Sequence, residues 1–255
     1  MLLNEYALMN LSNYLDSTYL KLPSQANLSE EQTKQKVIQL IQDAIVFNFK
    51  LVMIRSNYIS LAKKMIHEAK ASVLTGTVIG FHEGTNTIEE KLIEAQKSID
   101  LGVDELDFVI NYHAFKNQNT TLVQKEVLKG TSLGLKNNKV VKWIIEVAAL
   151  TDNEIAEITK LIRSVVVTNF SNKDAEKVFV KSSTGFFKTE NNVPNGATID
   201  SIKIIVKNAK PLQIKAAGGV KSKQDVSKMI ALGVTRIGTS SAKEIIQEKS
   251  IKHNY

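Results

Sequence analysis

Short apolar runs rich in β-branched residues alternate with longer amphipathic stretches along the whole chain. The runs have the length of strands, and the longer stretches repeat apolar residues at a spacing of about 3.6, as helices do. The predicted strands are residues 14–18, 50–55, 72–80, 105–111, 140–147, 177–183, 212–217 and 235–239. The predicted helices are residues 30–47, 58–70, 87–101, 113–136, 152–164, 197–208, 222–232 and 241–249, with an extra one near 4–13.

Strands that alternate with helices pair in parallel through right-handed crossovers. Eight such units in 255 residues have the usual size of one closed barrel. The pattern therefore predicts an α/β fold, a single (β/α)8 TIM barrel with an extra N-terminal helix, as one domain over residues 1–255. Residues 164–170 (SVVVTNF) have the composition of a strand but are interpreted as a helix end, and residues 187–195 (FKTENNVPN) as a long loop.

Three of the predicted strands have one apolar face and one charged face. Successive strand residues face opposite sides. The apolar sets are Leu106, Phe108 and Ile110, then Val178 and Val180, then Leu212, Ile214 and Ala216; the opposing sets are Glu105, Asp107 and Val109, then Lys177, Phe179 and Lys181, then Gln213 and Lys215. Helices cover the outside of a barrel, so the apolar sets pack beneath them and the charged sets point inward. Asp107, Lys181 and Lys215 should converge inside, each near the carboxyl end of its strand, where barrel enzymes build their active sites.

The two interior lysines predict a specific chemistry. Neighbouring strands are roughly 4.8 Å apart, so their ammonium groups could approach within about 5 Å and repel by roughly 3 kcal/mol, or about two pKa units. Desolvation acts in the same direction, and a neutral amine can attack a carbonyl. Lys181 is the better nucleophile candidate because small hydroxylated residues and Gly185 follow it. Lys215 would stay protonated and keep Lys181 reactive.

A phosphate site is predicted beside these lysines. Gly218 and Gly219 follow Lys215 closely and would allow an anion to approach the backbone. The segment 238–241 (GTSS) follows the last strand, and the loops after strands seven and eight of such barrels commonly hold a phosphate.

Composition removes several classes of function. The chain has no cysteine, which rules out disulfides, thiolate metal sites and a cysteine nucleophile. Its histidines, His67, His82, His113 and His253, form no metal-ligand pattern, so neither a metal nor another cofactor is expected. The net charge of +7 comes from 33 basic residues interleaved with 26 acidic ones and forms no basic stripe with aromatic residues. No nucleic-acid partner is expected, although the charge would attract anionic substrates.

The sequence also bears on location and assembly. The N-terminus (MLLNEYALMN) has no basic leader and no cleavage site, and no apolar run approaches membrane-spanning length. A cytoplasmic protein without membrane contact is expected. The oligomeric state does not follow from the sequence, and a homodimer is compatible with it.

Three motifs in this order resemble the deoxyribose-phosphate aldolase family. They are GVDELD (102–107), VKSSTGF (180–186) and KAAGGV (215–220), and the resemblance runs from LDST (15–18) to GTSS (238–241). It implies a class I aldolase that interconverts 2-deoxy-D-ribose 5-phosphate with D-glyceraldehyde 3-phosphate and acetaldehyde. Lys181 would then form the Schiff base, with Lys215 as second lysine and Asp107 as proton donor and acceptor. Asp16 and Thr18 would lie near the reacting hydroxyls, and phosphate contacts would map to Gly185, Gly218, Gly219, Lys221, Ser240 and Ser241.

The chain departs from the family pattern at several loop positions. His82 and Glu83 stand where the family usually has a proline and an apolar residue, Val147 lies near a usual threonine, Lys221 near a usual arginine, and 187–195 replaces a short glycine-rich loop. Lysine keeps the charge of arginine but loses its bidentate fork. Tyr255 matches a terminal tyrosine of family members. Two alternatives stay open: a class I aldolase or transaldolase for another sugar phosphate, and a non-catalytic phosphate-binding barrel.

Overall fold

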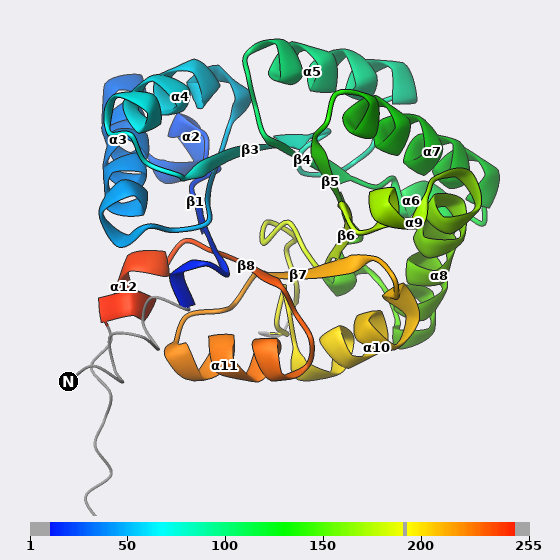
Figure 1. Cartoon of the computed structure of the whole chain (residues 1–255). Helices are drawn as coiled ribbons and strands as arrows, with labels where there is room; N and C mark the ends of the chain where they lie inside the picture. Colours follow the sequence, from blue (N-terminus) through cyan, green and yellow to red (C-terminus); the bar gives the residue numbers. More distant parts are fainter. Residues whose placement is uncertain (1–10, 191–192, 248–255) are drawn as a thin grey trace, which may run out of the picture.

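Eight parallel strands form a closed barrel, in which each strand pairs with the next along the chain and β8 pairs with β1 (Figure 1). The computed structural model describes residues 11–190 and 193–247. The strands are β1 Leu15–Thr18, β2 Leu51–Ile54, β3 Leu74–Ile79, β4 Glu105–Val109, β5 Val140–Ile144, β6 Val178–Lys181, β7 Gln213–Ala217 and β8 Arg236–Thr239. The predicted (β/α)8 barrel is confirmed.

Helices surround the barrel on its outer face (Figure 1). The longer ones are α3 Glu30–Phe47, α4 Ile59–Glu68, α5 Ile88–Asp100, α7 Thr120–Lys136, α8 Asp152–Asn169, α10 Ile199–Ala209, α11 Lys223–Ala231 and α12 Ala242–Gln247. Shorter turns are α2 Pro23–Ala26, α6 Tyr112–Lys116, α9 Asn172–Ala175 and the 3-10 turns Ser56–Tyr58 and Val147–Ala149. Among the described residues, no helix has the length and apolar character needed to cross a membrane.

Side-chain caps set where several crossover helices begin. Ser29, Thr87, Thr151 and Ser222 each accept a hydrogen bond from the backbone N–H three residues later, and the residue at that position binds back to the cap. These reciprocal bonds satisfy donors that the first helical turn leaves free. The capping residues therefore fix the point at which the chain leaves each loop at the carboxyl end of the barrel.

Two elements differ clearly from the sequence prediction. The helix expected over 113–136 is broken into α6 and α7, because Gln118 has a positive φ of 59° and Asn119 caps a new helix. The strand expected over 140–147 ends at Ile144, since Glu146 has a positive φ of 56° and a 3-10 turn follows. Residues 164–169 continue α8 as interpreted. The helix expected near 4–13 lies largely outside the described residues, as Tyr255 does, and Leu11 and Ser12 are helical.

The apolar core has two parts. The larger part lies between the outer face of the barrel and the helices and includes Trp143, stacked on Phe108 at 4.9 Å. The smaller part fills the barrel beside β2 and β3 with Leu51, Met53 and Val78. The remainder of the interior carries charges, which are described next.

Candidate active site

A network of ionic side chains occupies the barrel interior on the side of β4 to β8 and β1. Its acidic members are Asp16, Glu105 and Asp107, and its basic members are Lys142, Lys181, Lys215 and Arg236. All are at most 5% exposed. Charges buried to this degree persist only when they are paired, and this network pairs each of them.

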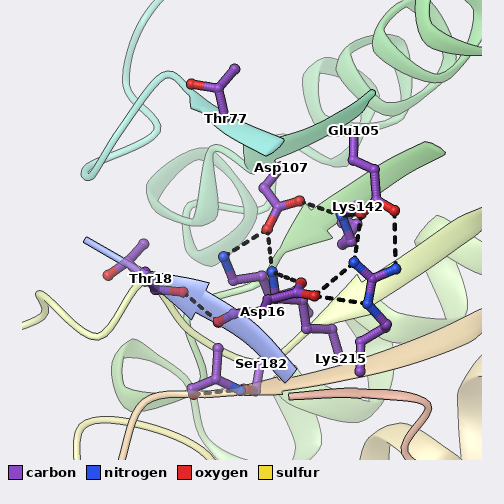
Figure 2. A network of polar contacts seen from close by, with 12 residues as sticks. Asp16, Thr18, Thr77, Glu105, Asp107, Lys142, Ser182 and Lys215 are labelled. Atoms are coloured by element: carbon purple, nitrogen blue, oxygen red, sulfur yellow. Dashed lines mark hydrogen bonds and ion pairs between the residues drawn. The ribbon is translucent and has the colours of Figure 1, made fainter. Parts of the chain in front are cut away.

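Asp107 on β4 joins three lysines, of which Lys142 and Lys215 are labelled in Figure 2. Its Oδ2 accepts hydrogen bonds from Lys181 Nζ at 2.8 Å and Lys215 Nζ at 2.9 Å, and its Oδ1 accepts one from Lys142 Nζ at 2.8 Å. Strand register explains the meeting, because Asp107 lies opposite Lys142 on β5, and Lys181 on β6 lies opposite Lys215 on β7. The predicted convergence of Asp107, Lys181 and Lys215 is thus present in the structure.

Arg236 on β8 ties the rest of the network together. Its guanidinium donates to both oxygens of Glu105 at 3.0 Å and, through Nε, to Asp16 Oδ1 at 2.8 Å. Asp16 Oδ2 in turn lies 2.6 Å from Lys215 Nζ, and Glu105 also pairs with Lys142. The planar fork of arginine suits such bidentate pairing with a carboxylate.

Lys181 is the cation with the fewest carboxylate partners. It pairs with Asp107 alone among the described residues, whereas Lys142, Lys215 and Arg236 each pair with two carboxylates. Burial lowers the pKa of Lys181 to about 8, with Lys215 adding to the effect and Asp107 opposing it. A substantial fraction of this amine is therefore neutral near physiological pH.

The causes of that shift refine the sequence prediction. Repulsion between the two lysines and desolvation were both expected to lower the pKa of Lys181; both do, and burial is the larger cause. Burial disfavours the charged form of Asp107 too, yet Lys142, Lys181 and Lys215 outweigh it and hold the Asp107 pKa well below its usual value. The site thus combines an ionised carboxylate with a reactive amine.

A cavity of about 610 Å³ opens above Lys181. Many of the residues that line it lie at or just after the ends of β1, β6, β7 and β8, among them Thr18, Lys181, Gly185, Gly218, Gly219, Lys221 and Ser240. Gly218 and Gly219 have φ values of 85° and 81°, and nothing lies within 4 Å of the position that a Gly219 side chain would take. The bare backbone at Gly219 leaves room for a ligand, as the sequence suggested.

Other predicted residues lie elsewhere. Asp16, Asp107 and Lys215 are fully buried and are not among the residues that line the cavity, so Lys181 separates them from it. Asp107 and Lys215 also lie in the middle of their strands, whereas Lys181 ends β6. Lys215 is nevertheless in register with Lys181, and both Asp107 and Lys215 lie two residues before the carboxyl end of their strand. Ser241 does not line the cavity, and its N–H donates to Thr239 Oγ1 at 3.0 Å.

Sequence reasoning missed several members of the site. Lys142 lies between Val140 and Ile144 on one face of β5, so the comparison of strand faces could have found it. Arg236 opens β8 and carried no motif. Lys21 and Lys36, which line the cavity from the β1–α3 segment, gave no signal because each reads as a solvated lysine.

Glu146 is a further buried carboxylate beside the site. It accepts hydrogen bonds from Ser183 Oγ at 3.0 Å and Thr184 N at 3.1 Å, and it also binds Thr184 Oγ1. Burial raises the pKa of Glu146 despite these bonds. It thereby fixes the start of the segment that follows Lys181. Among residues 11–190 and 193–247, no group of three or more acidic, histidine or cysteine side chains is placed to hold a metal ion.

The chain is similar to several known proteins, although no family model matches it. A protein of Staphylococcus saprophyticus subsp. saprophyticus named deoxyribose-phosphate aldolase is 35% identical over 240 residues, which cover 94% of this chain and 96% of that protein. One of the same name from Mycoplasma capricolum subsp. capricolum is 35% identical over 251 residues, covering 97% and 99%. A solved structure of deoxyribose phosphate aldolase from Aeropyrum pernix, described as a unique tetramer, has a TM-score of 0.76 at 25% identity and covers 94% of this chain and 91% of that one.

Proposed function

The chain belongs to the deoxyribose-phosphate aldolase family, and we propose that it reversibly cleaves 2-deoxy-D-ribose 5-phosphate to D-glyceraldehyde 3-phosphate and acetaldehyde. In the family this is aldehyde-lyase chemistry, used in the breakdown of deoxyribonucleosides and deoxyribose phosphate. The observation that carries the proposal is the Lys181 amine, which lines the cavity and has a pKa of about 8. Such an amine is neutral often enough to attack an aldehyde at neutral pH.

The proposed reaction begins when neutral Lys181 attacks C1 of the open-chain sugar. Loss of water leaves a protonated imine, which can accept electrons from the neighbouring carbon. A base removes the proton of the C3 hydroxyl, the C2–C3 bond breaks, and glyceraldehyde 3-phosphate departs. The two-carbon enamine that remains on Lys181 takes a proton at C2, and hydrolysis of the imine then releases acetaldehyde and the free lysine.

Asp107 is the proposed proton donor and acceptor, with Lys215 and Asp16 behind it. In the free protein Lys181 Nζ lies 2.8 Å from Asp107 Oδ2 and separates that oxygen from the cavity. Formation of the imine would redirect the Lys181 nitrogen and leave Asp107 Oδ2 with Lys215, 2.9 Å away. A carboxylate held in this way can pass protons between Lys215 and the substrate, directly or through a water molecule.

The proposed phosphate site lies in the same cavity as Lys181. Gly185, Gly218, Gly219 and Ser240 offer backbone or hydroxyl donors there, and Lys221 supplies positive charge. Thr18 would lie near the sugar hydroxyls. Ser241 remains a proposed phosphate contact through a ligand-induced shift, since it lies outside the lining of the free cavity.

A coupled assay tests this function. The purified protein should release glyceraldehyde 3-phosphate from 2-deoxy-D-ribose 5-phosphate, measured by a dehydrogenase that consumes the product. Lys181→Met should abolish the release, whereas Lys177→Met, a matched change of a half-buried lysine just before the same strand, should leave it intact. A panel of other sugar phosphates distinguishes the alternative, an aldolase for a different substrate, because that enzyme would prefer another member of the panel.

The setting of the enzyme is also a proposal. We expect one catalytic domain over residues 1–255, a cytoplasmic location, no cofactor and a homodimer. Light scattering on the eluting protein would measure its assembly, and a tetramer like that described for the Aeropyrum pernix relative would replace the dimer. Activity that survives exhaustive chelation would support the metal-free mechanism.

A further inference from the structure

The interior network contains one more cation than carboxylates. Its four basic groups are Lys142, Lys181, Lys215 and Arg236, and its three carboxylates are Asp16, Glu105 and Asp107. An uncompensated charge inside a barrel is costly. The network becomes balanced when one of the four cations loses its proton.

Geometry decides which cation that is. Arg236 binds both oxygens of Glu105 and also Asp16, while Lys142 binds Glu105 and Asp107. Lys215 lies 2.6 Å from Asp16 and 2.9 Å from Asp107. Lys181 therefore shares Oδ2 of Asp107 with Lys215, because Lys142 binds the other oxygen, Oδ1. In the described part of the chain, no second carboxylate lies within ion-pair distance of Lys181.

We infer that Arg236 and Glu105, which touch neither Lys181 nor the cavity, act as positioning residues whose opposite charges set the protonation of Lys181. Arg236 forms ion pairs with Asp16 and Glu105. Without Arg236, the negative charges of these two carboxylates would offset the positive charges of the lysines more fully. Glu105 holds Lys142, which would otherwise draw Asp107 away from Lys181. This inference rests on the proposed imine chemistry only for its biological purpose, because the linkage of charges exists without a substrate.

Other charged groups lie around Lys181 but make no ion pair with it in the described part of the chain. Glu146, in the turn after β5, accepts hydrogen bonds from Ser183 and Thr184 and interacts electrostatically with Lys181, and burial raises its pKa. Lys21, Lys36 and Lys221 line the cavity and are exposed to solvent, which screens them. The groups that face Lys181 from β1, β4, β5, β7 and β8 are the six other members of the network.

Two substitutions should shift the titration of Lys181 in opposite directions. Arg236→Met removes a positive charge, so Lys181 should hold its proton to higher pH, by about one unit. Glu105→Gln removes a negative charge at nearly constant shape, so Lys181 should lose its proton at lower pH, again by about one unit. Arg236→Lys, which keeps the charge, should stay near the wild-type midpoint, and the double variant Glu105→Gln/Arg236→Met should return toward it.

The titration can be measured without any substrate. Trace acetylation with acetic anhydride at a series of pH values, followed by peptide mass spectrometry, reports the reactivity of Lys181 relative to exposed Lys207. Circular dichroism confirms the fold of each variant, and if Arg236→Met does not fold, Glu105→Gln decides alone. Midpoints that move in opposite directions support the inference; midpoints that stay together, or move the same way, overturn it. A wild-type protein that is inactive on the sugar phosphate would refute the proposed function without affecting this result.

Discussion

The interior of the barrel is filled in two different ways. Beside β2 and β3 it holds Leu51, Met53 and Val78, and the Met53 terminal methyl carbon lies 2.6 Å from the position that a Cβ at Gly76 would take. Beside the other strands it holds the ionic network around Asp107. The apolar side needs only shape to be stable, whereas the charged side needs complete pairing. The candidate reactive groups therefore lie on the charged side of the interior, and the apolar side carries none of them.

The largest effect should follow removal of the Lys181 amine. We expect Lys181→Met to reduce turnover of 2-deoxy-D-ribose 5-phosphate by roughly 10⁴-fold or more, since the bond-forming group is lost. Stability should rise or stay unchanged, because the cation that the network compensates least is removed. Steady-state kinetics and urea denaturation measure the two effects. Substantial residual turnover would show that another amine of the charged side, and not Lys181, attacks the substrate.

A smaller but still large effect is expected at Asp107. Asp107→Asn should reduce turnover by roughly 10²- to 10⁴-fold, because the proposed proton donor and acceptor is lost. Burial lowers the pKa of Lys181 to about 8 and Asp107 opposes this shift, so the variant should bring the midpoint further down and make imine formation reach its plateau at lower pH. The pH dependence of imine trapping measures this, and an upward shift of the midpoint would contradict the account.

The apolar side should respond in stability alone. Met53→Ala leaves a cavity beside Gly76 and should lower the free energy of unfolding by about 2–5 kcal/mol. The pH midpoint of Lys181 should stay at its wild-type value, because no charge changes. Urea denaturation and trace acetylation test the two statements, and a shifted midpoint would show that the two sides of the interior are not separate.

The smallest effect is expected at the mouth of the cavity. Lys221→Ala should raise KM for the phosphorylated substrate by roughly two- to fivefold at low salt, since exposed charges contribute little individually. The value of kcat should not change, and the matched change Lys207→Ala on α10 should affect neither constant. If KM for unphosphorylated deoxyribose rises equally, Lys221 does not contact phosphate.

The two sides also differ in what their sequence predicted. On the charged side, the alternation of Asp107 with Leu106 and Phe108 identified the interior face directly. On the apolar side, every residue of β2 (LVMI) is apolar and buried, so alternation cannot tell which face points inward. The sequence of a single strand also does not show how it is aligned with its neighbours. The contacts of Arg236 with Asp16 and Glu105, which lie far apart in the chain, were therefore not predicted.

The motifs predicted the reactive residues of the site better than they predicted the other residues that line the cavity. Lys181 and Lys215 could be placed from their strands, and Gly218 and Gly219 from their turn, because backbone conformation limits what those positions do. Lys21 and Lys36 could not be assigned to the cavity, since the path of the β1–α3 segment depends on packing against distant loops.

Reduction of the imine tests the central claim most directly. The protein is incubated with acetaldehyde and sodium borohydride, digested, and searched by mass spectrometry for a lysine that carries a two-carbon adduct. We expect the adduct on Lys181, with a yield that rises as the pH increases through about 8, where the amine becomes neutral. No adduct, or an adduct on Lys215 or Lys142 in place of Lys181, would contradict the account.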